Sequence, residues 1–75
     1  MIHNSIREYR ELKSMSQECL AQEVGVSRQT IVSLEKGSYN PSLELSFRLS
    51  KVLEMPITSL FQWEEEKWKK LELEP

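Results

Sequence analysis

Residues 17–36 read QECLAQEVGVSRQTIVSLEK, and this stretch decides the fold of the 75-residue chain. Leu20, Ala21 and Val24 recur with the spacing of one helix face, which predicts a short amphipathic helix. Gly25 ends that helix, because glycine tolerates the positive φ that follows a helix C-terminus. The sequence therefore predicts a helix that stops at a tight turn in the middle of the stretch.

A second short helix is predicted directly after the turn. Ser27 can cap its start, and Gly37 stops it. Ile31 and Leu34 have the spacing of an inward face. The opposite face carries Arg28, Gln29, Val32, Ser33 and Lys36. Two helices joined in this way form a helix-turn-helix, in which the second helix enters the major groove of DNA N-terminus first.

These two helices belong to a longer pattern of small, glycine, apolar and polar residues. Its members are Ser16-Gln17, Leu20-Ala21, Val24-Gly25-Val26-Ser27, Ile31, Leu34-Glu35, Gly37 and Asn40-Pro41-Ser42-Leu43. In order and spacing this pattern resembles the Cro and phage-repressor type of helix-turn-helix, the Xre family of bacterial and phage transcription regulators. The resemblance covers residues 6–61. It implies an all-α, five-helix λ-repressor-like domain with a small antiparallel β element formed by the two ends of the chain.

Length and composition fit one small domain over residues 1–75. A chain this short buries only about 60–65% of the surface that its unfolded form exposes, which leaves no room for a second core. With 39% apolar residues, 29% charged residues and two glycines, the composition is typical of a compact helical domain. A single cysteine cannot form an internal disulfide, and no transmembrane run is visible. We therefore expect a soluble, cytoplasmic protein without membrane contact.

The charge balance argues mildly against DNA binding. The formal net charge is −2 and the isoelectric point is about 5.4, whereas DNA-binding domains are usually basic. Residues 1–62 contain seven Lys and Arg against seven Glu, so the excess acid lies in residues 63–75, with three against five. We therefore expect a locally positive face around Arg28, Lys36 and Lys13.

The remaining elements follow from local patterns. A first helix is expected over residues 4–13, and another over 42–53, where a stripe recurs at helical spacing: Leu43, Ser46, Leu49, Ser50 and Leu53. Thr58 can cap a short last helix. Residues 61–65 alternate as a strand would, and the resemblance implies that they pair with residues 1–4, although a helical spacing also fits this tail of about residues 62–75.

Residues on the second helix and around it are candidates for DNA contact. Arginine can pair with guanine, glutamine with adenine, and an apolar group with a thymine methyl. The predicted base-contacting residues are Arg28, Gln29, Val32 and Ser33. The predicted backbone-contacting residues, several of them implied by the resemblance, are Gln17, Thr30, Lys36, Ser38, Tyr39 and Asn40. The alternative is an ordinary solvated helix face followed by a polar turn.

Two further sets of residues have predicted structural roles. The resemblance implies that Arg10 and Glu35, each at the edge of an apolar face, form a partly buried ion pair. The last third of the chain carries more apolar side chains than one small core needs, so it is the predicted dimer interface. The interface residues expected there are Ile57, Leu60, Phe61 and Trp63.

The function expected from these features is sequence-specific DNA binding. We expect a homodimeric transcription regulator that binds a pseudo-palindromic operator and represses by occupying a promoter. Alternatives are an antitoxin-type regulator whose tail binds a partner protein, or an interaction module that has kept the fold. We expect no enzyme, cofactor or metal: His3 stands alone, Cys19 has acidic neighbours, and no catalytic constellation is visible.

Overall fold

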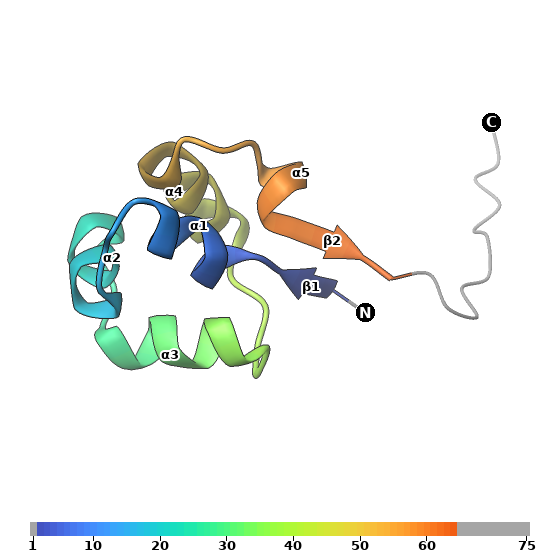
Figure 1. The fold of residues 1–75 in the computed structure, drawn as a ribbon. Coiled ribbons are helices and arrows are strands. Elements are labelled where there is room, and N and C mark those ends of the chain that lie inside the picture. Colours follow the sequence, from blue (N-terminus) through green and yellow to red (C-terminus); the bar gives the residue numbers. More distant parts are fainter. Residues whose placement is uncertain (1, 65–75) are drawn as a thin grey trace, which may run out of the picture.

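Within residues 2–64, the fold consists of five helices around one apolar core, with a two-stranded ribbon at one end (Figure 1). This computed structural model describes residues 2–64. The elements are, in order, β1 (Ile2–Asn4), α1 (Ile6–Leu12), α2 (Gln17–Val24), α3 (Arg28–Lys36), α4 (Leu43–Leu53), α5 (Ile57–Leu60) and β2 (Phe61–Trp63). The five helices and the small antiparallel β element that the sequence predicted are confirmed.

The turn between α2 and α3 has the predicted capping. Gly25 adopts the left-handed conformation, with φ 77°, and the backbone N–H of Val26 donates to the carbonyl of Ala21 at 3.0 Å. This hydrogen bond closes the end of α2 in the manner of a Schellman motif. Ser27 Oγ then accepts from the backbone N–H of Thr30 at 3.2 Å and starts α3. Gly25 therefore ends α2, and Ser27 starts α3, as the sequence predicted.

The core lies between the helix-turn-helix and the two helices that follow it. Its buried apolar side chains are Ile6, Leu20, Ala21, Val24, Ile31, Leu34, Leu45, Leu49, Leu53 and Leu60. The predicted α4 stripe is wrong at its first member, because Leu43 is 71% exposed. Ser42 caps α4, so Leu43 is the first helical residue and points away from the core, while Leu45 faces inward.

Two predicted helix boundaries need correction. The first helix ends at Leu12, before the predicted residue 13, because Ser14 takes a positive φ of 56° that reverses the chain. Thr58 does not cap the last helix, since Pro56 is the N-cap residue and α5 already begins at Ile57. The proline ring is compatible with the extended backbone of Pro56, at φ −66° and ψ 152°, and the Pro56 carbonyl accepts from the backbone N–H groups of Ser59 and Leu60.

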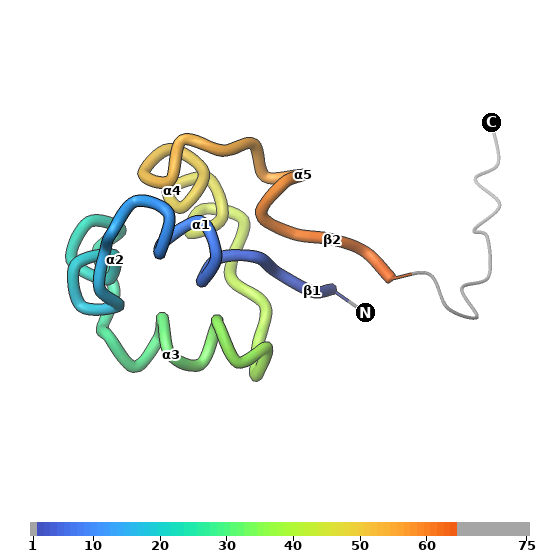
Figure 2. Tube along the Cα trace, viewed as in Figure 1, coloured from blue at the N-terminus to red at the C-terminus, as the bar shows by residue number. Residues whose placement is uncertain are grey.

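The two ends of the domain meet in the ribbon (Figure 2). β1 and β2 are antiparallel, with Ile2 opposite Trp63 and Asn4 opposite Phe61. The Asn4 side chain joins this ribbon to the helix-turn-helix, because its Nδ2 donates to the carbonyl of Leu34 at 2.9 Å. The predicted strand pairing is therefore confirmed between residues 2–4 and 61–63. The alternative conformations considered for residues 66–75 lie outside the described part of the chain.

Candidate nucleic-acid interface

The outer surface of α3 presents the predicted base-contacting residues. Arg28 and Gln29 are exposed in the first turn, while Val32 and Ser33 are half-buried one turn later. The opposite face is anchored in the core by Ile31, which is fully buried. A helix held in this way projects its N-terminal side chains outward from a rigid support, as major-groove reading requires. The base contacts themselves stay a prediction.

A chain of hydrogen bonds runs beneath this surface. Arg10 Nε donates to Glu35 Oε2 at 2.7 Å, and Arg10 Nη2 donates to Glu35 Oε1 at 3.2 Å. The two side chains are only 9% and 5% exposed, so the predicted ion pair is present and mostly buried. Glu35 Oε1 also accepts from Gln17 Nε2 at 3.1 Å. Gln17 Oε1 in turn accepts from Arg28 Nη2 at 3.3 Å.

The ion pair also changes the charge of the candidate surface. The hydrogen bond with Glu35 raises the pKa of Arg10, an effect that burial opposes, so the guanidinium stays charged at neutral pH. Arg10 therefore neutralises the carboxylate of Glu35, which is the one acidic residue of α3. The remaining charged residues of this helix, Arg28 and Lys36, are both cationic and exposed. α3 thus has a net positive character although the isoelectric point of the chain is acidic.

The sequence predicted that Lys13 contributes to this positive surface, but Lys13 does not. Its ammonium pairs with the carboxylate of Glu54 at the end of α4. The hydrogen bond and charge of Lys13 lower the pKa of Glu54 below its ordinary value. The charge of Lys13 is therefore offset within the fold, and the predicted positive face is reduced to Arg28 and Lys36.

The predicted backbone-contacting residues lie at both ends of α3. Gln17 is half-buried at the start of α2, and Thr30 is half-buried with its hydroxyl 3.0 Å from Ser27 Oγ. Lys36, the last residue of α3, is exposed, and so are Ser38, Tyr39 and Asn40 in the loop that follows. Partial burial raises the pKa of the Tyr39 hydroxyl, which therefore stays a hydrogen-bond donor at neutral pH. Their contact with phosphate is not tested by this geometry and stays a prediction.

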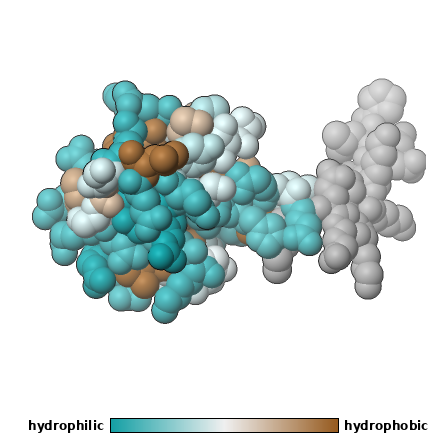
Figure 3. Space-filling view, viewed as in Figure 1, coloured by the Kyte–Doolittle hydropathy of each residue, from teal (hydrophilic) through white to brown (hydrophobic). Residues whose placement is uncertain are grey.

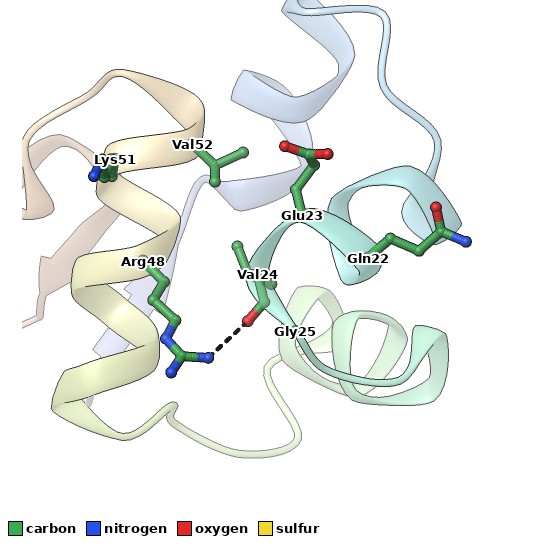
Figure 4. A pocket seen from close by; sticks show the side chains of 7 residues that line it. All are labelled: Gln22, Glu23, Val24, Gly25, Arg48, Lys51 and Val52. Carbon is green, nitrogen blue, oxygen red and sulfur yellow. Dashed lines mark hydrogen bonds between the residues drawn. The ribbon is translucent and has the colours of Figure 1, made fainter.

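A separate hollow of about 530 Å³ lies between the end of α2 and α4 (Figure 4). Its lining residues are Gln22, Glu23, Val24, Gly25, Arg48, Lys51 and Val52. Arg48 Nη1 donates to the carbonyl of Val24 at 3.2 Å, and Arg48 Nη2 donates to Glu44 at 2.5 Å. Arg48 therefore supports the C-terminal end of α2 from the adjacent helix, which is a structural role.

The predicted dimer interface is only partly available at the surface. Leu60 is wrong as an interface residue, because its side chain is fully buried where α5 packs into the core. Ile57 and Phe61 are half-buried, and Trp63 is 52% exposed on β2. Ile2, opposite Trp63 in the ribbon, is 39% exposed. Elsewhere the face viewed in Figure 3 is mostly hydrophilic, with hydrophobic residues in separate small groups.

Within residues 2–64, no group of three or more His, Cys, Asp and Glu side chains could hold a metal ion. None of the helices in this described range is long and apolar enough to cross a membrane.

Comparison with known proteins identifies the family. A sequence profile described as Helix-turn-helix matches residues 6–60, which is most of the chain. The chain belongs to this helix-turn-helix family. The regulator is 44% identical over 63 residues to an HTH-type transcriptional regulator of Methanocaldococcus jannaschii, an alignment that covers 84% of this chain and 96% of that one.

Two further similarities agree with this assignment. The regulator is 35% identical to the cryptic phage CTXphi transcriptional repressor RstR of Vibrio cholerae, over 80% of this chain and 54% of that one. The restriction-modification controller protein C.AhdI of Aeromonas hydrophila has a similar structure, with a TM-score of 0.68 and 33% identity over 72% of this chain and 82% of that one. The chain is therefore a DNA-binding transcriptional regulator of the helix-turn-helix type. The family that it matches consists of regulators rather than enzymes.

Sequence reasoning missed the hydrogen bonds that connect the candidate site to the rest of the domain. Gln17 and Glu35 were assigned to separate roles, although their side chains contact each other. Arg10 also donates to the carbonyl of Met15 at 2.7 Å, which fixes the chain just before α2. The resemblance identified the Arg10–Glu35 pair, but no spacing in the sequence indicated these additional partners.

Proposed function

We propose that the regulator binds a pseudo-palindromic operator as a homodimer and represses transcription by occupying a promoter. The observation that carries this proposal is the outer surface of α3. It joins two cationic side chains, Arg28 and Lys36, to the amide of Gln29, while its acidic residue is neutralised by Arg10. The similarity to a phage repressor supports repression rather than activation.

Each exposed residue of α3 has a defined chemical task in this proposal. The guanidinium of Arg28 pairs with the O6 and N7 atoms of guanine, and the amide of Gln29 pairs with the N6 and N7 atoms of adenine. Val32 contacts a thymine methyl group, and the hydroxyl of Ser33 donates to or accepts from a neighbouring base edge. These four side chains together supply the sequence preference.

A second set of residues positions the helix without reading sequence. Gln17 lies at the start of α2, where unpaired backbone N–H groups favour a phosphate. Thr30 and Lys36 on α3, and the loop residues Ser38, Tyr39 and Asn40, donate to phosphates on either side of the groove. Because these contacts displace counterions, the affinity should depend strongly on salt concentration.

Dimerisation follows from the small size of the interface that one copy can make. One domain contacts few bases and phosphates, whereas two joined domains read half-sites about one helical turn apart and combine their binding energies. The surface proposed for the contact is formed by Ile57, Phe61 and Trp63, together with Ile2 on the adjacent strand. Aromatic and aliphatic side chains that are exposed, as in Ile2 and Trp63, or half-buried, as in Ile57 and Phe61, are typical anchors of protein interfaces.

The experiment that tests this function is selection of binding sites from a random duplex library, followed by fluorescence anisotropy at several salt concentrations. We expect an inverted repeat to be selected. We also expect the logarithm of the affinity to fall linearly with the logarithm of the salt concentration. If no sequence is enriched, or if binding does not depend on salt, the fold serves as a protein-interaction module and the proposal is wrong.

A further inference from the structure

The chain of hydrogen bonds under α3 connects a buried ion pair to a predicted base-reading side chain. It begins at Arg10 in α1, continues through Glu35 in α3 and Gln17 in α2, and ends at Arg28 in the first turn of α3. Glu35 is the branch point, because its Oε1 atom accepts from both Arg10 Nη2 at 3.2 Å and Gln17 Nε2 at 3.1 Å. The carboxylate of Glu35 therefore belongs to the buried ion pair and also contacts Gln17 at the candidate site.

The chemistry of these groups fixes the orientation of the Gln17 amide. A carboxylate only accepts hydrogen bonds, and a guanidinium only donates them. The amide of Gln17 lies between Glu35 and Arg28 and can satisfy both only with its NH2 group toward Glu35 and its oxygen toward Arg28. The opposite orientation would place two donors against each other at Arg28 and two acceptors at Glu35. Glu35 thus holds the amide of Gln17 in the orientation that turns its oxygen toward Arg28.

We propose that Glu35 is a positioning residue for base reading, which acts through Gln17 on the guanidinium of Arg28. This inference rests on the proposed reading of DNA by α3. The bond to Gln17 occupies one N–H of the Arg28 side chain, which has five such donors. It therefore limits the rotation of the guanidinium and leaves donors for a two-bond contact with guanine. A guanidinium that is free to rotate would lose part of its preference for guanine.

The role differs from that of a structural ion pair. A structural pair affects stability, and it changes the affinity for all DNA sequences through the folded fraction. A positioning residue also changes the preference at one base pair. The two roles can therefore be separated by measuring discrimination between bases, rather than affinity alone.

The test uses a duplex that the wild-type chain selects from a random library. Arg28→Ala first identifies the base pair that Arg28 reads, as the position where preference is lost. A good two-bond arginine contact discriminates between bases by about 5- to 150-fold. Glu35→Gln preserves size but can present an NH2 group to Gln17, so the amide can reverse. We expect this variant to lose about fivefold or more of the discrimination at that base pair, and none elsewhere.

The matched control is Arg10→Lys. This variant keeps a cation on Glu35 and leaves the bond between Glu35 and Gln17 in place, but it loses the two-bond geometry of the ion pair. We expect it to lower the melting temperature, as Glu35→Gln does, without a change in base preference. In a Gln17→Ala background, Glu35→Gln should have no further effect on discrimination, because the connecting side chain is missing. An equal effect with and without Gln17 would overturn the proposed route.

A measurement on the wild-type chain covers the case in which Glu35→Gln does not fold. The side-chain amide protons of Gln17 should exchange with solvent more slowly than those of Gln22, an exposed residue of the same helix. Equal exchange would overturn the inference. Unchanged discrimination in folded Glu35→Gln would also overturn it, while the proposed function would stand. If the wild-type chain selects no sequence at all, the proposed function fails, and the inference fails with it.

Discussion

The ion pair between Arg10 and Glu35 predicts a large loss of stability from one substitution. Arg10→Met removes three hydrogen bonds, two to Glu35 and one to the carbonyl of Met15. It also leaves a carboxylate whose side chain is only 5% exposed without its cation. Removing one partner of a buried pair typically destabilises a protein by about 3–5 kcal/mol, because the remaining charge is poorly solvated. Gln17 still donates to Glu35, so we expect about 3 kcal/mol.

The double variant Arg10→Met with Glu35→Leu should recover most of this loss. Both charges are then absent, and apolar side chains of similar volume often replace a buried pair without large destabilisation. The carbonyl of Met15 still lacks its donor, which leaves a residual loss of about 1 kcal/mol. The difference between the double variant and the sum of the single variants measures the coupling of the two side chains.

Urea unfolding followed by circular dichroism measures these free energies. For a chain of this length, each 1 kcal/mol shifts the melting temperature by roughly 4–8 °C, so Arg10→Met should melt at least about 12 °C lower. Arg7→Met is the matched control on the same helix. Arg7 pairs with Glu11 at the surface, with side chains 68% and 56% exposed, so little loss is expected. Small and additive effects of the Arg10 and Glu35 substitutions, at an unchanged urea dependence, would refute the reasoning.

Two other predictions concern the backbone and the dimer. Ser14 and Gly37 both have positive φ, at 56° and 79°, so Ser14→Gly should stabilise the fold and Gly37→Ala should destabilise it, each by about 1 kcal/mol in thermal melts. A change of the same sign in both variants would contradict this conformational explanation. Trp63→Ser should convert the proposed dimer into a folded monomer in sedimentation velocity, because it removes the largest exposed apolar side chain of the ribbon. Leu12→Ser, which alters an equally apolar residue that is 77% exposed at the end of α1, should leave the dimer intact. An unchanged dimer in Trp63→Ser would move the interface to another surface.

The parts of the fold that local chemistry controls could be predicted from the sequence. Gly25 and Gly37 end helices because they accept positive φ, and Ser16 and Ser27 start helices because their side chains accept backbone hydrogen bonds. The strand pairing at the chain ends was also predictable, but only through the resemblance to a known family. Apolar spacing alone left a helix as an alternative for the same residues.

Other features depend on how the elements pack and could not be obtained from spacing. Leu60 is apolar, as an interface residue would be, yet its side chain on the short α5 is fully buried in the core. Lys13 and Glu54 are distant in sequence and become partners only when α1 and α4 lie together. The same is true of Gln17 and Glu35, whose contact requires a particular angle between α2 and α3. Tertiary geometry therefore determines the connections of the site, while local sequence determines its members.

The claim that α3 reads base edges is tested most directly through Gln29. This residue is exposed in the first turn of α3, so its replacement by alanine should leave the fold intact. At one fixed salt concentration, Gln29→Ala should bind the selected duplex more weakly by about 1–3 kcal/mol, with relaxed preference at one symmetric base pair in each half-site. If the folded variant keeps the wild-type preference at every position, α3 is not docked in the major groove as proposed.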